Sequence, residues 1–90
     1  MNLDTIWSNI LKHEGEKFYT IRGIEFIYTS KNGDKIIPSN IDGSKLSPIT
    51  KDTIGKVIAE YMPLKNTAEI GRVFRAPSYI YAILTDNRIV

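Results

Sequence analysis

Residues Lys17 to Pro38 alternate between apolar and polar side chains, and this period of two limits the folds open to the chain more than any other part of it. Two turn signals, Arg22-Gly23 and Asn32-Gly33, divide the stretch into three segments of strand length. We therefore expect these residues to form a three-stranded antiparallel meander.

Two-residue turns would bring six large apolar side chains onto one face of this sheet. The three cross-strand pairs are then Ile21 with Ile24, Tyr19 with Phe26, and Tyr28 with Ile37. The opposite face is a mixture of apolar and polar side chains, which suits partial exposure. We therefore expect helices to cover the first face only.

A first helix is expected before the meander. Asp4 is placed to cap a helix from about Thr5 to Glu14, in which apolar side chains recur at three- and four-residue spacing. Gly15 is suited to the left-handed conformation that ends many helices. After the meander, residues 38–50 are rich in proline, serine and glycine, and we expect them to form the longest loop.

Further helices are expected after this loop. Thr50 is placed to cap a helix from about Lys51 to Met62, and Pro63 ends it because proline cannot continue a helix. Asn66 and Glu69 have the spacing of a capping box, which predicts a short third helix.

The last segment has two interpretations. Pro77 suits the first turn of a helix, so a fourth helix is expected from about Pro77 to Thr85. Residues 78–84 also alternate well enough to form a strand, and the period alone does not decide between the two. In either case the chain is expected to be one small α+β domain over residues 1–90. It would consist of an N-terminal helix, a three-stranded antiparallel meander, and two or three C-terminal helices packed on one face of the sheet.

Composition limits the function only loosely. The 90 residues include no cysteine, so neither disulfides nor a thiolate metal site can stabilise the fold. The formal charge of +2 is too small to predict a nucleic-acid or membrane partner on its own. No stretch approaches the roughly 20 apolar residues of a membrane helix, and no secretory signal is visible. We therefore expect a soluble, cytoplasmic protein with no membrane partner.

Candidates for catalysis are sparse. His13 lies beside Glu14 and Glu16, but a solvated helix end fits this segment better than a metal site, which normally gathers three or four supported ligands. Glu25 lies between apolar neighbours, where an outward-facing strand position explains it and an acid–base role is the alternative. The sequence contains no serine elbow, phosphate loop or dinucleotide fingerprint. We therefore expect no enzyme activity, no catalytic residue, no metal, no cofactor and no small-molecule substrate.

Arginine and aromatic side chains gather in the last twenty residues. The candidate binding residues are Arg72, Arg75, Tyr79, Tyr81, Arg88 and Ile89. Arginine beside aromatic rings is enriched in protein interfaces, and the same combination grips phosphates and stacks on bases. Two exposed arginines at a helix end would equally need no partner. We expect binding of a protein partner or homodimer formation through this segment, with nucleic-acid binding by the Arg72/Arg75 helix as the alternative.

Two stretches carry a resemblance. "HEGEKFYTIRG" near the start and "APSYIYAILTDNRI" at the end are similar to a group of small, uncharacterised bacterial proteins, and the isoleucine-rich composition suits an AT-rich bacterial or phage genome. The resemblance implies a compact, stand-alone bacterial domain and no site residues. The helix at 51–62, the turn after it and the short third helix also resemble a helix-turn-helix in part, although the order of elements is not that of a winged helix.

Overall fold

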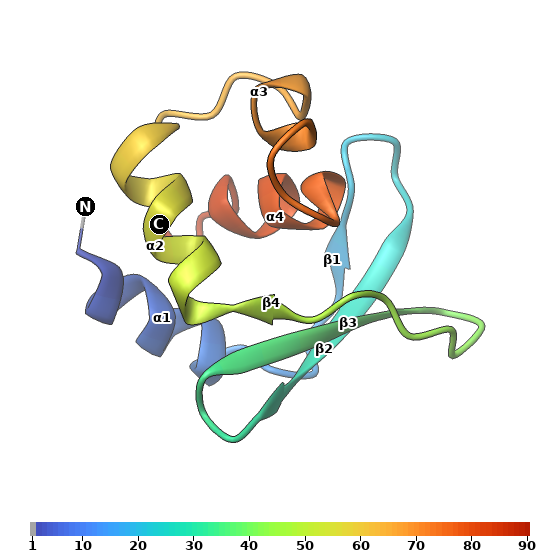
Figure 1. Cartoon of the computed structure of the whole chain (residues 1–90). Coiled ribbons are helices and arrows are strands. Elements are labelled where there is room, and N and C mark those ends of the chain that lie inside the picture. Colours follow the sequence, from blue (N-terminus) through green and yellow to red (C-terminus); the bar gives the residue numbers. More distant parts are fainter. Residues whose placement is uncertain (1) are drawn as a thin grey trace.

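The computed structural model describes residues 2–90, in which an antiparallel sheet is packed against helices on one side (Figure 1). The elements in chain order are α1 (Leu3–Lys12), β1 (Phe18–Tyr19), β2 (Glu25–Lys31), β3 (Lys35–Asn40), β4 (Ile49–Thr50), α2 (Lys51–Glu60), α3 (Ala68–Gly71) and α4 (Pro77–Leu84). The strand order is β1-β2-β3-β4, and all neighbours are antiparallel. The predicted α+β class is confirmed, but the sheet has four strands rather than three.

The fourth strand lies at the end of the predicted loop. Residues 41–48 are still the longest loop between the elements of residues 2–90, but the predicted bounds of 38–50 are too wide because both ends pair in the sheet. The chain turns tightly after β3, where the Asn40 amide donates to the Ser44 carbonyl at 3.0 Å. The returning segment then pairs with β3 again, through Ile49 opposite Ile36. Pro38 does not interrupt β3, and its carbonyl accepts a hydrogen bond from the Leu46 amide at 2.9 Å. Prolines and serines indicated a loop, but the local pattern did not reveal this pairing.

Both hairpins of the meander contain one residue more than predicted. In the first, Thr20 still pairs with Ile24, where the Thr20 amide donates to the Ile24 carbonyl at 2.9 Å, so three residues form the loop. In the second, Lys31 opposes Lys35, and again three residues lie between them. Gly23 in the first loop has a φ of 84°, which glycine adopts without strain. The extra residues shift β1 and β3 by one position against β2.

This shift exchanges side chains between the two faces of the sheet. The core side is lined by the buried strand residues Phe18, Phe26, Tyr28, Ile36, Pro38 and Ile49. Four of the six residues predicted on that side lie elsewhere: Tyr19, Ile21 and Ile24 are exposed, and Ile37 is half-buried. Of the six predicted residues, only Phe26 and Tyr28 in β2 are buried as expected. The shift moves β1 and β3 relative to β2, so the side chains of β2 stay on the predicted face.

The first helix begins two residues earlier than predicted. Its cap is Asn2 and not Asp4, since the Asn2 Oδ1 atom accepts hydrogen bonds from the amides of Asp4 at 2.8 Å and Thr5 at 3.2 Å. Asp4 instead occupies the first turn, where its negative charge complements the helix dipole. The predicted stop is consistent with the structure, because Gly15 has a φ of 83° shortly after α1 ends.

The predicted caps of the next two helices are confirmed. Thr50 Oγ1 accepts a hydrogen bond from the Thr53 amide at 3.1 Å at the start of α2, which ends two residues before the predicted Met62. Before α3, Asn66 and Glu69 each accept from the amide of the other at 3.2 Å. The short helix buries Ile70, whereas Val73, just after it, is exposed.

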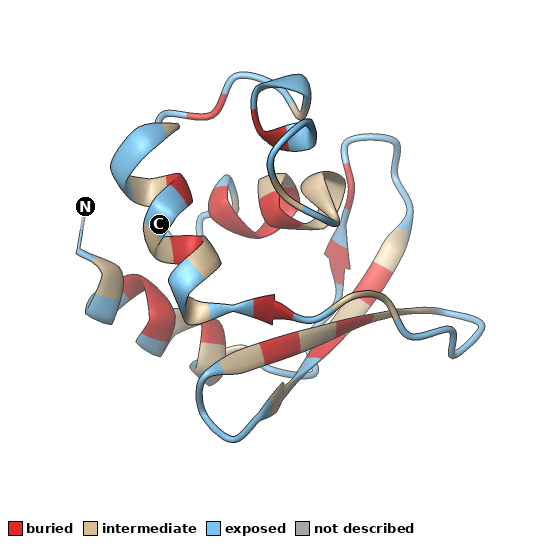
Figure 2. Cartoon of the chain, in the orientation of Figure 1, coloured by how far each residue is buried: buried red, intermediate tan, exposed pale blue. Residues whose placement is uncertain are grey.

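Helix α4 lies in the middle of Figure 1, with α2 on one side of it and β1 on the other. Residues 78–84 are therefore helical, and the strand alternative is excluded. Pro77 is in the first turn as predicted, and Ile80, Ile83 and Leu84 are fully buried. Figure 2 shows that every helix and strand contains buried positions, and these residues form one hydrophobic core to which α4 contributes Ile80, Ala82, Ile83 and Leu84. A segment near the end of the chain thus supplies the centre of the core.

Candidate functional site

Arg88, predicted to contact a partner, is bound within its own chain. Its Nε and Nη2 atoms donate to the two carboxylate oxygens of Asp86 at 3.0 and 2.9 Å. Nη1 donates to Glu16 Oε1 at 3.2 Å, and Nη2 also donates to the Lys17 carbonyl at 3.0 Å. The guanidinium carbon lies 3.8 Å from the centre of the Phe18 ring. Arg88 therefore joins the end of the chain to the start of the sheet.

These contacts shift the pKa values of all three ionised groups. The hydrogen bonds from Arg88 lower the pKa of Asp86, and those from His13 and then Arg88 lower the pKa of Glu16. The hydrogen bond to Asp86 in turn raises the pKa of Arg88. Because each group favours its charged form, the cluster is a fixed network of ions at neutral pH.

Ile89 and Tyr79 also serve the fold. The side chain of Ile89 is only 1% exposed, and Asn9 Nδ2 donates to its carbonyl at 3.0 Å. The ring of Tyr79 packs edge-on against Phe26 with centroids 4.8 Å apart, and its hydroxyl donates to Asn40 Oδ1 at 3.1 Å. Ile89 is therefore not at the surface, and Tyr79 is fixed between α4 and the sheet.

The remaining predicted residues are divided between core and surface. Tyr81 is half-buried against the core. Arg72 and Arg75 are exposed beside α3, and neither takes part in the ion pairs formed among residues 2–90. The structure therefore does not bring the six predicted residues together on one surface.

The two candidates for chemistry have ordinary partners. Glu25 Oε1 accepts a hydrogen bond from the Tyr19 hydroxyl at 3.1 Å and lies 3.9 Å from Lys17 Nζ. His13 Nδ1 lies 2.9 Å from Glu16 Oε2, three residues further along the chain. Among residues 2–90, no group of three or more histidine or acidic side chains is placed to share a metal ion.

Exposed apolar side chains gather at one end of the sheet. Of the six large ones exposed among residues 2–90, four belong to the β1–β2 hairpin or to the turn after β3. These are Tyr19 (56% exposed), Ile21 (66%), Ile24 (50%) and Ile41 (76%), which we call the hairpin patch. Phe26 opposes Asn40 in the sheet, and this pairing brings the two turns to the same end. Both lie on the right of Figures 1 and 2, and the tips of both are coloured as exposed.

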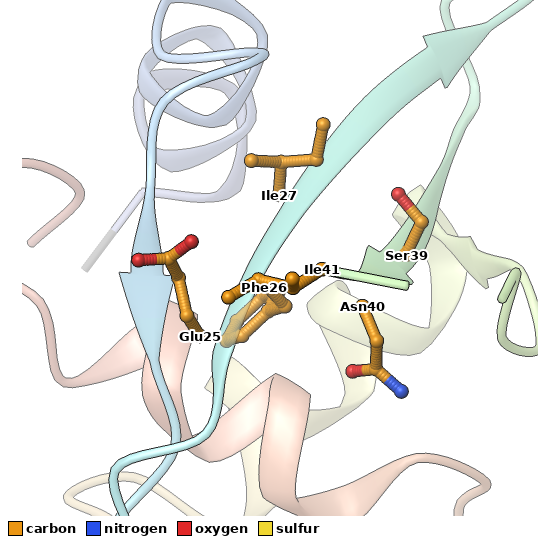
Figure 3. Close-up of a pocket in the computed structure, with 6 residues that line it drawn as sticks. All are labelled: Glu25, Phe26, Ile27, Ser39, Asn40 and Ile41. Atoms are coloured by element: carbon orange, nitrogen blue, oxygen red, sulfur yellow. The ribbon is translucent and has the colours of Figure 1, made fainter. Parts of the chain in front are cut away.

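A first hollow lies within this end of the sheet. It has a volume of about 310 Å³ and is formed by neighbouring parts of β2 and β3 (Figure 3). Its lining residues are Glu25, Phe26, Ile27, Ser39, Asn40 and Ile41. The hollow is mainly apolar, and the Glu25 carboxylate at its edge is already held by Tyr19.

A second hollow, of about 300 Å³, is lined by Tyr79, whose ring packs against Phe26 of the first hollow. We call it the arginine hollow because Arg22 is its charged residue. The hairpin supplies Thr20, Ile21, Arg22 and Ile24. The opposite wall consists of Thr67, before α3, and of Ser78 and Tyr79 in α4. The hairpin and the α3–α4 region lie side by side at the top right of Figure 1.

This end of the sheet could not be recognised as a site from the sequence, because Ile21 and Ile24 were predicted to face the core. The loop between Thr20 and Ile24 has three residues instead of the predicted two, and this length places both isoleucines at the surface. None of the helices among residues 2–90 is both long and apolar enough to cross a bilayer. No family model, no curated protein and no solved structure matches the chain.

Proposed function

We propose that the protein is a non-enzymatic interaction module that binds another protein chain through the hairpin patch. The observation that carries this proposal is the concentration of four exposed large apolar side chains at one end of the sheet. Exposed large apolar side chains that are concentrated in one region are typical of interaction sites. The predicted role in protein binding is thus kept, while its location moves from the C-terminal segment to the hairpin patch.

The free energy gained by burying the side chains of the hairpin patch supports an interface. Fully burying an isoleucine contributes roughly 1.5–3 kcal/mol, so the exposed half to three-quarters of each patch isoleucine is worth about 1–2 kcal/mol on binding. Three such side chains together with Tyr19 supply a central apolar cluster, although association costs offset part of the gain. The core does not need these residues, because Phe18, Phe26 and Tyr28 already fill the inner face.

The first partner to test is a second copy of the chain, since a self-complementary patch is the simplest route to a two-fold dimer. Sedimentation velocity should show association of the wild-type protein at micromolar concentration. The double variant Ile21→Ser/Ile24→Ser should stay monomeric with an unchanged melting temperature. Val90→Ser removes another exposed apolar side chain, outside the patch, and should associate like the wild type.

A monomeric wild type would exclude the dimer and move the test to other proteins. A photo-crosslinking amino acid at position 24 should then form a discrete adduct with one protein in an extract of the source cells. The Ile21→Ser variant should lose that adduct. Absence of both the dimer and the adduct would refute the proposed function.

Nucleic-acid binding remains the second proposal, supported by Arg72 and Arg75, which are exposed and take part in none of the ion pairs among residues 2–90. It requires affinity for DNA or RNA that falls steeply with salt, and a smaller salt slope when either arginine is replaced by glutamine. A gel-shift titration at low salt measures this. We rank it second because the two aromatic rings nearest these arginines in sequence already pack within the fold. Phe74 packs edge-on against Tyr61, and Tyr79 packs edge-on against Phe26.

A further inference from the structure

We propose that the arginine hollow receives a carboxylate of the bound protein, carried next to an apolar side chain. This inference rests on the proposed function and names the chemistry of the partner. It is argued from the lining of the hollow, from the charges around it and from the isoleucines at its rim.

The lining of the hollow suits an anion. Arg22 is its only charged lining residue, and no carboxylate lines it. Arg22 takes part in none of the ion pairs among residues 2–90, so its guanidinium is free to bind a ligand. A guanidinium presents a fork of donors that matches a carboxylate. The Thr67 hydroxyl, which makes no capping bond to α3, is a further donor in the opposite wall.

The surrounding segments have the same sign of charge. Residues 19–24 and 63–78 contain Arg22, Lys65, Arg72 and Arg75 but a single acidic residue, Glu69. The Glu69 carboxylate is occupied, since its Oε1 atom accepts hydrogen bonds from the backbone amides of Lys65 at 2.7 Å and Asn66 at 3.2 Å. These two segments therefore attract anions although the chain as a whole has a formal charge of only +2.

The rim of the hollow favours a protein ligand over free phosphate. Ile21 and Ile24 line it and are at least half exposed, so a ligand that reaches Arg22 also meets two apolar side chains. A phosphate group would leave both uncovered. A peptide carboxylate beside a leucine-like side chain would fill the hollow and cover part of the hairpin patch at once.

A pair of small probes tests this assignment on the intact protein. N-acetyl-leucine carries the proposed carboxylate and apolar group, and N-acetyl-leucinamide lacks only the charge. Titration into the ¹⁵N-labelled protein should give saturable shifts of the Arg22, Thr67 and Ser78 amide signals with the acid and not with the amide. Arg22→Gln should weaken binding of the acid at least about tenfold, since it removes a charge-assisted hydrogen bond. Lys31→Gln, an exposed charge at the other hairpin tip, should leave it unchanged.

Three results would overturn the inference. They are the absence of saturable shifts with the acid, equal shifts with the amide, and tighter binding of inorganic phosphate than of N-acetyl-leucine, which would instead favour the nucleic-acid alternative. The probe experiment does not depend on complex formation. Probe binding without a dimer or an adduct would support the arginine hollow as an anion site but refute the proposed function. A complex without probe binding would support the proposed function but refute the role of the arginine hollow.

Discussion

Replacement of Arg88 by alanine should destabilise the fold, because this side chain fixes the end of the chain to the sheet. It would remove the paired hydrogen bonds to Asp86, the bond to the Lys17 carbonyl, the ion pair with Glu16 and the contact with the Phe18 ring. The residue next to it, Ile89, is buried in the core. Loss of the arginine would therefore loosen a segment that contributes to packing.

The magnitude follows from the separate contacts. The charge-assisted bond to the carbonyl is worth about 1.5 kcal/mol, and the cation–π contact about 1 kcal/mol. The local pair with Asp86 adds about 1 kcal/mol, whereas the solvent-exposed pair with Glu16 adds little. These contributions overlap, so we expect a loss of about 2–3 kcal/mol in the free energy of unfolding, or roughly 10–20 °C in melting temperature for a chain of this size.

Thermal and urea unfolding followed by circular dichroism would measure the loss. Arg88→Lys keeps the charge but not the forked geometry, and it should lose about half as much. Arg72→Ala removes an exposed arginine without an ion pair and should change the free energy of unfolding by less than about 0.5 kcal/mol. If Arg88→Ala melted within about 2 °C of the wild type, the structural role would be wrong and the side chain would again be a candidate for partner binding.

Two further predictions concern the ends of helices. Thr50→Ala removes the cap of α2, which accepts from the Thr53 amide, and should cost about 1 kcal/mol in urea unfolding, while Thr50→Ser should restore most of it. Glu14, just after α1, accepts hydrogen bonds from the Ser30 amide and hydroxyl, which lower its pKa. Its stabilising effect is therefore complete above the ordinary pKa of about 4.3 and is lost as pH falls through the lower, folded value. Glu14→Gln should make stability fall less steeply between about pH 5 and 3, and an unchanged slope would contradict this.

The local parts of the fold could be predicted because they depend on neighbours in the sequence. The cap at Thr50, the reciprocal bonds of Asn66 and Glu69, and the first turn at Pro77 each involve residues no more than three positions apart. The helical period of residues 77–84 could not be separated from a strand until the neighbouring elements were known, because the segment is buried on most sides.

The register could not be predicted, since it depends on the length of two loops. A two-residue and a three-residue hairpin fit the same glycine signal, but they place Ile21 and Ile24 in different surroundings. One additional residue in the hairpin loop therefore determines both which side chains face the core and where the candidate site lies. Arg88 was also misjudged, because its partners Glu16 and Lys17 lie more than 70 positions away.

The way a partner could bind is limited further by the free backbone of the sheet. Strand β1 covers only the start of β2, and beyond it the edge of β2 would be open to another strand. Other residues of the chain already occupy this edge. The Gly15 amide donates to the Tyr28 carbonyl at 3.0 Å, and the Glu14 carboxylate accepts a hydrogen bond from the Ser30 amide at 2.8 Å. Addition of a strand at this edge would break both bonds, so the side chains of the hairpin patch, rather than the backbone of β2, are what the molecule offers to another protein.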